Sequence, residues 1–343
     1  MRTPALRPRR VAALGLLAAT TVGLAACGTE SDAPGVGDNT GGGGSPAECE
    51  GQDGEYLIGM SQANVAEPYR QQMDDDIRAA AEEVPQFEVV FADAAQDNAK
   101  QVSDVENFLA QGIDLLIISP NEAAPLTAVV ERAYGEGIPV IVLDRKIEGD
   151  SYTQFIGADN FEIGRAAGEY VATELLPDGG NVVEIKGLPG STPAQERSEG
   201  FAEGISSVPE IEVVADGVGD WLRELGQSQA EAIYQANPEI DVVYAHNDPM
   251  AEGAYLAAQS AGRAEEMEFI GIDALPIPSG GIRAVEEGRL SATFVYPTGG
   301  REAVETAQQI LLECTEVEQE QVLQTQLVTE ENASELYTEL GGQ

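Results

Sequence analysis

The sequence predicts an α/β protein made of two doubly wound parallel sheets. Ten short apolar runs recur between residues 55 and 297, and most are continuous rather than alternating, which is typical of parallel strands covered on both faces. Segments with helical spacing separate the runs, so that strand and helix alternate along the chain. Ten strands are many for one open sheet, and we therefore expect two lobes of about five strands each.

The ten runs predict ten strands, and the segments between them predict helices. In chain order the runs are EYLIGMS, FEVVFAD, DLLIISP, IPVIVLD, TQFIGAD, NVVEIKG, IEVVADG, DVVYAHND, EFIGIDA and SATFVYP. Residues 98–112 place Val102, Val105 and Phe108 at helical spacing and end at Gly112, which is a typical helix stop. Residues 300–314 repeat this pattern and predict another helix.

Residues 1–26 are predicted to be an export leader and not part of the fold. Four arginines near the N-terminus precede an apolar stretch, residues 11–26, that is too short to favour a resident transmembrane helix. The stretch ends in LAAC, which resembles the lipobox of bacterial lipoproteins, where Cys27 would receive lipid after cleavage and become the new N-terminus. A plain secretory signal with an incidental cysteine is the alternative.

Residues 27–54 predict a flexible tether, because they are rich in Gly, Ser, Asp and Pro and have almost nothing to bury. The four glycines at 41–44 do not form a phosphate-binding loop, since no Gly-Lys-Ser/Thr follows them. No later segment is apolar for long enough to span a bilayer, and we expect the body from residue 55 onward to be soluble and merely anchored.

Charge and composition exclude several classes of function. The formal net charge is −42, and such a field repels nucleic acid and anionic lipid, so we expect neither as a partner. The chain has one histidine, which leaves almost nothing for a histidine-based zinc site or Ser-His-Asp catalysis. We therefore expect no metal and no cofactor.

Polar side chains follow nearly every predicted strand. In doubly wound sheets a ligand binds in the crevice beyond the carboxyl ends of the strands, which makes these positions the candidate site. About half of them are expected to be helix N-caps instead, with Asp159, Asn247 and Asp248 the best candidates. The positions are Ser61, Gln62, Asp93, Ser119, Asp144, Arg145, Asp159, Asn160, Asp220, Asn247, Asp248 and Asp273.

These residue types suit a neutral polyol such as a sugar. Carboxylates and amides accept hydrogen bonds from hydroxyl groups, arginine donates in a fixed fork, and aromatic faces cover C–H surfaces. Catalytic signatures fail: there is no Gly-x-Ser-x-Gly and no histidine pair, and GVGDWL breaks the dinucleotide pattern at its last glycine. We therefore expect a binding protein and not an enzyme.

Several long segments resemble the ribose/galactofuranose type of periplasmic sugar-binding proteins. They are FLAQGIDLLIISPNEAAPLTAVVERAYGEGIPVIVLDR, AQERSEGF, YAHNDPMAEGA and IGIDALPIPSGGIRAVEEGRLSATF, and the likeness extends from about Tyr56 to Val328. Repressors of the lactose type share this fold, but here an export leader replaces their DNA-binding headpiece.

The resemblance implies two lobes joined by a three-crossing hinge, with sugar held between them. The crossings would fall near 158–160, 296–297 and 324, so that lobe 1 comprises 55–158 plus 297–323 and lobe 2 comprises 159–296 plus 324–343. Both lobes would then be discontinuous in sequence.

The resemblance also implies most of the site. Asp144 would accept from sugar hydroxyls while Arg145 donates; the alternative is a solvated strand end or a weak local ion pair. Further ligand-binding residues implied in this way are Arg197, Trp221, Asn247, Asp273 and Asp93, with Gln96 a weaker companion, Tyr296 left open, and His246 assigned to packing.

Tyr69 and Arg70 complete the predicted site. The galactofuranose type places an aromatic residue followed by arginine at this distance from the first strand, and Tyr69-Arg70 resembles that pair. Arg70 would then meet the exocyclic arm of a hexofuranose; alternatively it forms an ion pair with Asp74, four residues on along the helix.

The resemblance implies that the protein is a monomer, anchored by lipid to the outer face of the cell membrane. It would capture a monosaccharide and deliver it to an ABC permease, which is driven by a separate ATPase subunit. A sugar sensor for a membrane kinase or chemoreceptor is the alternative. A glycosidase would need two carboxylates across the bond, and paired acid/base machinery is not evident.

The remaining cysteines, Cys49 and Cys314, predict one disulfide in an exported protein, with two free thiols as the competing interpretation. The family layout puts both at lobe 1, where the bond would tie the start of that lobe to the end of its returning helix.

Overall fold

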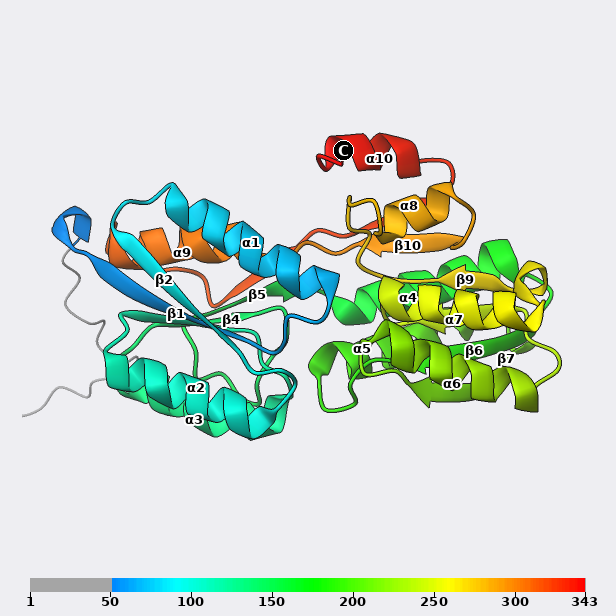
Figure 1. Cartoon of the computed structure of the whole chain (residues 1–343), viewed down its shortest axis with the longest axis horizontal. Coiled ribbons are helices and arrows are strands. Elements are labelled where there is room, and N and C mark those ends of the chain that lie inside the picture. The colour runs from blue at the N-terminus through cyan, green and yellow to red at the C-terminus, as the bar shows by residue number, and fades with distance from the viewer. Residues whose placement is uncertain (1–50, 343) are drawn as a thin grey trace, which may run out of the picture. The chain divides into compact units, whose positions relative to one another are not determined.

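The computed structural model describes residues 51–342, which fold as two α/β lobes joined by three crossings of the chain (Figure 1). Each of the ten predicted runs forms a strand. The predicted leader, the tether up to residue 50, and both Cys27 and Cys49 lie outside the described residues. None of the helices described is long and apolar enough to cross a membrane.

The first lobe is built on a six-stranded parallel sheet in the order β11-β5-β4-β3-β1-β2. Its strands are β1 (Tyr56–Gln62), β2 (Phe87–Asp93), β3 (Leu115–Ile118), β4 (Val140–Leu143), β5 (Gln154–Ala158) and β11 (Glu320–Leu323). Its helices are α1 (Pro68–Glu82), α2 (Asn98–Gln111), α3 (Ala123–Gly135) and α9 (Gly300–Leu311), with the short η1 (Gly51–Asp53) before β1. Helices α1 and α9 cover one face and α2 and α3 the other (Figure 1).

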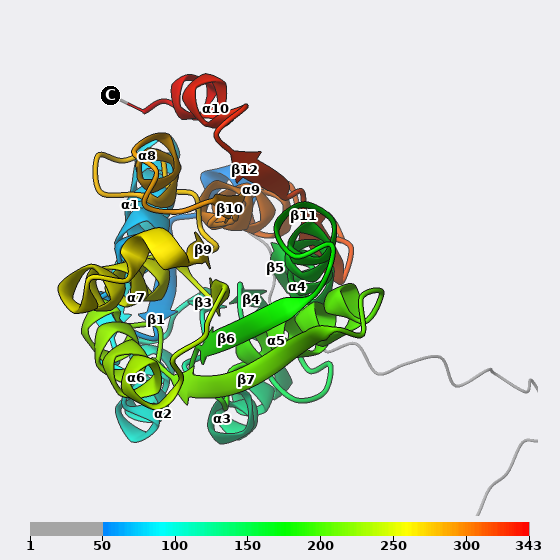
Figure 2. The same ribbon diagram turned by 90° about the vertical axis from the view of Figure 1, so that its right-hand side faces the viewer.

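The second lobe repeats this plan in the order β12-β10-β9-β8-β6-β7, with β12 antiparallel to β10. Its strands are β6 (Gly180–Lys186), β7 (Ile211–Val218), β8 (Val242–Ala245), β9 (Glu268–Ile270), β10 (Ala292–Val295) and β12 (Gln326–Thr329). Its helices are α4 (Asn160–Tyr170), α5 (Thr192–Ile205), α6 (Arg223–Ala236), α7 (Asp248–Ala261), α8 (Gly281–Glu286) and α10 (Ala333–Glu339), with η2 (Val171–Leu175) and η3 (Ala264–Glu266). Figure 2 shows α4 and α5 on one side of β6 and β7, and α6 and α7 on the other.

Central strands of both sheets are buried because their runs are apolar on both faces. All four residues of β3, β4 and β8 are buried. The two strands that the sequence did not predict, β11 and β12, are short and mix polar with apolar residues, so that exposed, half-buried and buried positions alternate along them. The chain crosses between the lobes three times: after β5, after β10, and between β11 and β12.

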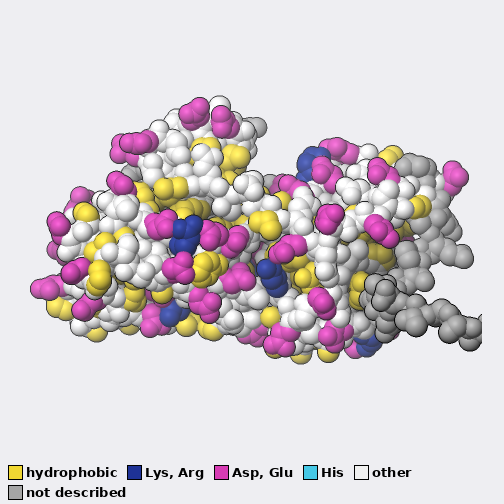
Figure 3. Space-filling view, turned by 180° about the vertical axis from the view of Figure 1, so that it is seen from behind, with side chains coloured by type: hydrophobic (Ala, Val, Ile, Leu, Met, Phe, Trp, Pro, Cys, Tyr) yellow, Lys and Arg dark blue, Asp and Glu magenta, His cyan; other side chains and the backbone are white. Residues whose placement is uncertain are grey.

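The surface is strongly acidic. Figure 3 shows Asp and Glu side chains over both lobes on one face, with only a few Lys or Arg side chains among them. Because like charges repel, this surface is a poor partner for anionic polymers.

Candidate functional site

A small cavity lies where the carboxyl ends of the two sheets face each other. Counted together with the adjoining space that is open to solvent, it has about 250 Å³ free of protein atoms. Side chains from both lobes and from the crossing after β10 line it, in keeping with the usual position of ligands in such sheets. The lining residues are Glu67, Tyr69, Arg70, Asp144, Arg145, Pro193, Arg197, Trp221, Asn247, Asp273 and Tyr296.

Asp144, directly after β4, is the centre of the charged network. Its Oδ2 lies 2.6 Å from Arg70 Nη2 and 3.8 Å from Arg145 Nε, and the Tyr296 hydroxyl donates to Oδ1 at 2.6 Å. Burial alone would raise the pKa of Asp144, but the two arginines and the tyrosine hydrogen bond outweigh burial and lower it. The carboxylate is therefore ionised.

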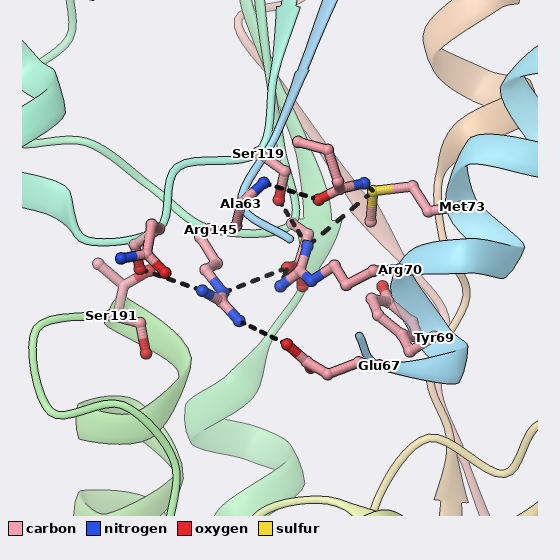
Figure 4. Close-up of polar contacts among 12 residues, drawn as sticks. Ala63, Glu67, Tyr69, Arg70, Met73, Ser119, Arg145 and Ser191 are labelled. Atoms are coloured by element: carbon pink, nitrogen blue, oxygen red, sulfur yellow. Dashed lines mark hydrogen bonds and ion pairs between the residues drawn. The ribbon is translucent and has the colours of Figure 1, made fainter. Parts of the chain in front are cut away.

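Arg70 reaches from α1 toward Ser119 and Arg145, as Figure 4 shows, and its guanidinium forms the ion pair with Asp144. Its Nη1 also donates to Ser119 Oγ at 2.6 Å. Asp74 is not the ion-pair partner of Arg70, because its Oδ1 accepts from Gln62 Nε2 at 2.8 Å. Arg70 thus belongs to the cavity and not to a salt bridge along the helix surface.

Arg145 lies between the lobes with its guanidinium over an aromatic ring. Its Cζ is 5.2 Å from the centre of the Trp221 ring, its Nη1 donates to Asn121 O at 3.0 Å, and its Nη2 is 3.9 Å from Glu67 Oε1 (Figure 4). Burial, assisted by Arg70, lowers the pKa of Arg145 to about 10, so the group remains charged at neutral pH.

Arg197 enters from α5 in the second lobe. Its Nε donates to Asn160 Oδ1 at 2.8 Å and its Nη1 donates to the carbonyl of His246. The guanidinium carbon lies 4.6 Å from the centre of the Tyr296 ring and 5.5 Å from that of Trp221. The side chain is therefore locked on both sides before any ligand arrives.

Trp221, Asn247 and Asp273 complete the second-lobe wall. Asn247 caps α7, since its Oδ1 accepts from Met250 N at 3.0 Å, and its Nδ2 donates to Trp221 O at 3.0 Å. Burial, reinforced by repulsion from Asp248, raises the pKa of Asp273 well above the usual range of a carboxyl group.

Backbone strain is concentrated at these strand ends. Asp144, Trp221 and Asp273 all have positive φ, at 68°, 70° and 137°. Such conformations cost about 1–3 kcal/mol for residues other than glycine and occur most often at functional sites. Strain at three separate strand exits that share one cavity indicates a binding site.

Three donors that face this region are buried without a hydrogen-bond partner among residues 51–342: Arg70 Nε, Arg145 Nε and Trp221 Nε1. An unsatisfied buried donor costs about 1–3 kcal/mol. A ligand with several acceptor oxygens would remove this cost.

Every predicted ligand-binding residue lines the cavity except Asp93. Its Oδ1 accepts from Ala95 N at 2.8 Å within its own loop, and its carbonyl accepts from Lys100 Nζ at 2.6 Å. The physical reason is position: β2 is the edge strand, so its end opens at the side of the sheet. Gln96 is also not part of the wall; it reaches across the lobes instead, and its Nε2 donates to Asp220 O at 3.1 Å.

The sequence missed Glu67 and Pro193 and left Tyr296 open. Glu67 precedes Pro68 at the start of α1, where an acidic residue indicates a helix cap, yet its side chain makes no capping hydrogen bond. In the sequence only its place directly before Pro68 is visible, and that position alone does not indicate a cavity residue. Tyr296 donates to Asp144 and accepts from Asn160 Nδ2 at 3.2 Å, which links both lobes at the crossing.

The lobes also contact each other directly around the cavity. Ala123 N donates to Gly190 O and Lys146 N donates to Thr192 Oγ1, each at 3.0 Å. With the small cavity, these bonds define a closed arrangement.

Two hinged α/β lobes that close on a charged and aromatic cavity define a ligand-binding protein of the type I periplasmic binding protein fold. The chain belongs to the family of the periplasmic binding protein domain, whose sequence profile matches residues 58–313.

Known relatives share most of this length. The ribose import binding protein of Bacillus subtilis is 32% identical over 263 residues, 76% of this chain and 83% of that protein. The fructose-binding periplasmic domain of a hybrid two-component system superposes with a TM-score of 0.81 at 44% identity, covering 83% of this chain and 94% of that one. A Mycobacterium smegmatis protein in complex with β-D-fucofuranose superposes with a TM-score of 0.77 at 32% identity, covering 82% and 93%.

Proposed function

We propose that this protein is a solute-binding protein, anchored by lipid to the outer face of the cell membrane, that captures a neutral monosaccharide and delivers it to the permease of an ABC transporter. The sugar would be a galactofuranose-like hexose or a pentose. The observation that carries the proposal is the set of three buried donors that make no hydrogen bond within the described chain, beside ionised Asp144 and two aromatic rings.

The cavity chemistry matches a sugar on three counts. Ring and hydroxyl oxygens accept from the free N–H groups, hydroxyl hydrogens bind the carboxylate of Asp144, and C–H faces pack on Trp221 and Tyr69. The proteins reported above bind ribose, fructose and β-D-fucofuranose, all of them neutral monosaccharides. No catalytic step is needed for this role.

Both lobes would contribute to binding. In this proposal lobe 1 (55–158 plus 297–323) supplies Tyr69, Arg70, Asp144 and Arg145, and lobe 2 (159–296 plus 324–343) supplies Arg197, Trp221, Asn247 and Asp273. A sugar would thus bridge the lobes and hold them together.

Arg70 supports a hexofuranose over ribose. Its Nε is buried without a hydrogen-bond partner in the described part of the chain, and a ligand with an exocyclic hydroxyl arm would supply one. A smaller pentose would leave that donor unpaired, at a cost of about 1–3 kcal/mol. Anionic sugars are disfavoured by the acidic surface.

A thermal-shift and calorimetry panel tests the proposal. We expect hexofuranoses to stabilise the protein more than ribose and glucuronate to have little effect, and we expect Arg70→Ala to weaken hexofuranose binding more than ribose binding. Arg78→Ala is the matched control, since Arg78 lies exposed on the same helix and pairs with Asp75. Tight ribose binding unaffected by Arg70→Ala would contradict the specificity, and no binding of any sugar would contradict the function.

The lipid anchor is proposed at Cys27, because LAAC follows the apolar leader. Two or more acyl chains would make anchoring stable. Cys27→Ser should release the protein from the membrane fraction and remove the lipid mass; unchanged membrane association would refute the anchor.

A sensing role is the second candidate, because the 44% identical neighbour is a domain of a two-component system. Deleting a transport subunit abolishes uptake of the labelled sugar. Deleting a sensor leaves uptake through the transporter intact and changes only the sugar-dependent expression of genes.

A further inference from the structure

A buried polar cluster lies beneath Arg197 in the second lobe. Glu184 Oε1 accepts from Ser198 Oγ at 2.6 Å and lies 2.9 Å from His246 Nε2. The three side chains come from β6, from α5 and from the residue after β8, and the His246 ring is fully buried. None of the three lines the cavity.

The geometry assigns one tautomer to His246. The backbone amide of Gly187 lies 3.2 Å from Nδ1, and an amide N–H can only donate, so Nδ1 carries the lone pair. The proton is then on Nε2, which donates to Glu184 Oε1. Burial, which outweighs the hydrogen bond that His246 donates to Glu184, lowers the pKa of His246. A second proton on Nδ1 would point at the N–H of Gly187, so that two donors would face each other.

The other groups around the ring leave this state undisturbed. Lys186 Nζ lies 3.5 Å from Glu184 Oε2 and 3.3 Å from Asp216 Oδ2. The aromatic rings of Tyr244 and Trp221 are centred 5.4 Å and 6.3 Å from the imidazole. Arg197 adds a positive charge that disfavours imidazolium.

The cluster supports the position of Arg197 through two neighbouring residues. The carbonyl of His246 accepts from Arg197 Nη1, and Ser198 directly follows Arg197 on α5. Glu184 therefore holds both His246, whose carbonyl accepts from the Arg197 guanidinium, and Ser198, which follows Arg197 in the chain. Asn160, which accepts from Nε, completes the support.

We propose that His246 is a positioning residue for ligand binding: held by Glu184 and Gly187, it fixes the carbonyl that aims Arg197 at the cavity. The inference rests on the proposed function, because it treats Arg197 as a sugar donor. His246 acts without contacting the ligand, which distinguishes it from the residues of the cavity wall.

The first experiment uses the unmodified protein. The chain has one histidine, so its ¹⁵N signals need no assignment. We expect Nε2 protonated and Nδ1 unprotonated at about pH 7, and less imidazolium at about pH 6.5 than the half that an unperturbed histidine would show there. A protonated Nδ1 overturns the proposal, whether or not any variant folds.

The second experiment measures the Kd for whichever sugar of the panel binds the wild type. His246→Asn keeps an acceptor for Gly187, His246→Gln keeps a donor for Glu184, and His246→Leu removes both. We expect the Kd to rise about tenfold or more in His246→Leu, equivalent to about 1.4 kcal/mol, and less in the other two.

Tyr234→Phe is the matched control. It removes a buried hydrogen bond of the same lobe, from the Tyr234 hydroxyl to Ala254 O at 3.1 Å, away from the cavity. Its Kd should match that of the wild type. An unchanged Kd in His246→Leu, or an equal loss in the control, overturns the proposal. If the wild type binds no sugar, the proposed function fails, while the tautomer still tests the geometry of His246 separately.

Discussion

At the residue scale, the adjacent Asp144 and Arg145 are the most informative pair. Two adjacent charges after a buried strand are compatible with a solvated strand end, but both side chains are about 97–98% buried, and their partners Arg70 and Glu67 come from another segment. A buried charge needs such partners because desolvation is costly. The network is therefore part of the cavity wall and not a surface ion pair.

Asp144→Asn should weaken sugar binding by about tenfold or more. Truncating one partner of a desolvated charge pair costs about 2–5 kcal/mol, and the substitution also leaves Arg70 and Arg145 without their shared carboxylate. Calorimetry measures the Kd. Asp93→Asn is the control, because Asp93 lies outside the cavity and should bind normally; equal losses in both variants would show that Asp144 has no special role.

The raised pKa of Asp273 predicts how the free energy of unfolding depends on pH. Its folded-state pKa lies above the unfolded value of about 3.9, so between these values the folded state holds more protons and the free energy of unfolding falls as pH rises. Asp248, whose pKa burial raises to about 7, acts in the same direction.

Asp273→Asn should therefore flatten the loss of stability as the pH rises above about 4, the unfolded-state pKa, as measured by urea unfolding of the ligand-free protein. The group that titrates is replaced by a neutral one of the same size. Parallel pH profiles for the wild type and the variant would count against a raised pKa at Asp273.

At the element scale, the α4–α5 pair positions Arg197 against Asn160. The two helices approach so closely that a Cβ on Gly200 would lie 2.0 Å from Phe161 O, and one on Gly164 would lie 2.3 Å from Arg197 O. Glycine is needed at both positions because the obstacle is backbone and cannot rotate away. Helix packing thus sets the distance between two polar side chains of the site.

Gly200→Ala should force the helices apart, at a cost of about 1–3 kcal/mol in stability, and should weaken sugar binding by displacing Arg197. Gly135→Ala is the matched control, since a Cβ there meets no atom within 4 Å. Urea unfolding and calorimetry give the two readouts. Normal stability and affinity in Gly200→Ala would mean that the close contact is not required.

At the scale of the whole molecule, the three crossings let the two sheets move as units. Bonds such as Ala123 N to Gly190 O and Gln96 Nε2 to Asp220 O join the two lobes and would break if the lobes moved apart. A ligand that contacts both lobes shifts the population toward this state by its differential affinity for it.

Small-angle X-ray scattering should accordingly show a smaller radius of gyration when the protein is saturated with its sugar. The Asp144→Asn variant at the same sugar concentration is the control and should shrink less, because fewer molecules are occupied. An unchanged radius for the saturated wild type would argue against closure by the ligand.

The predicted Cys49–Cys314 disulfide would join residues far apart in the chain. It stays a prediction, because Cys49 lies outside the described residues. The described chain begins close by: a Cβ on Gly51 would lie 3.9 Å from Cys314 Sγ. Thiol counting under denaturing conditions, with and without reductant, should show two thiols released by reduction; two thiols already free without it would exclude the bond.

Local sequence patterns predicted the fold class correctly, and together with the family resemblance they predicted most residues of the cavity wall. The ten apolar runs are local signals, since a strand buried on both faces must be apolar throughout, and their polar ends mark the ligand side of any doubly wound sheet. Whole-chain resemblance then singled out Arg70, Asp144 and Arg197 among many polar residues.

The tertiary structure decided which strand ends share the cavity. Asp93 is excluded because β2 lies at the sheet edge, and Glu67 and Tyr296 are included because α1 and the second crossing bring them to Asp144 and Arg145. Strands β11 and β12 also went unpredicted, since short, half-polar segments become strands only by pairing with β5 and β10. In each case the deciding contact joins segments far apart in the chain. Local sequence patterns reflect only neighbouring residues, so they do not predict such contacts.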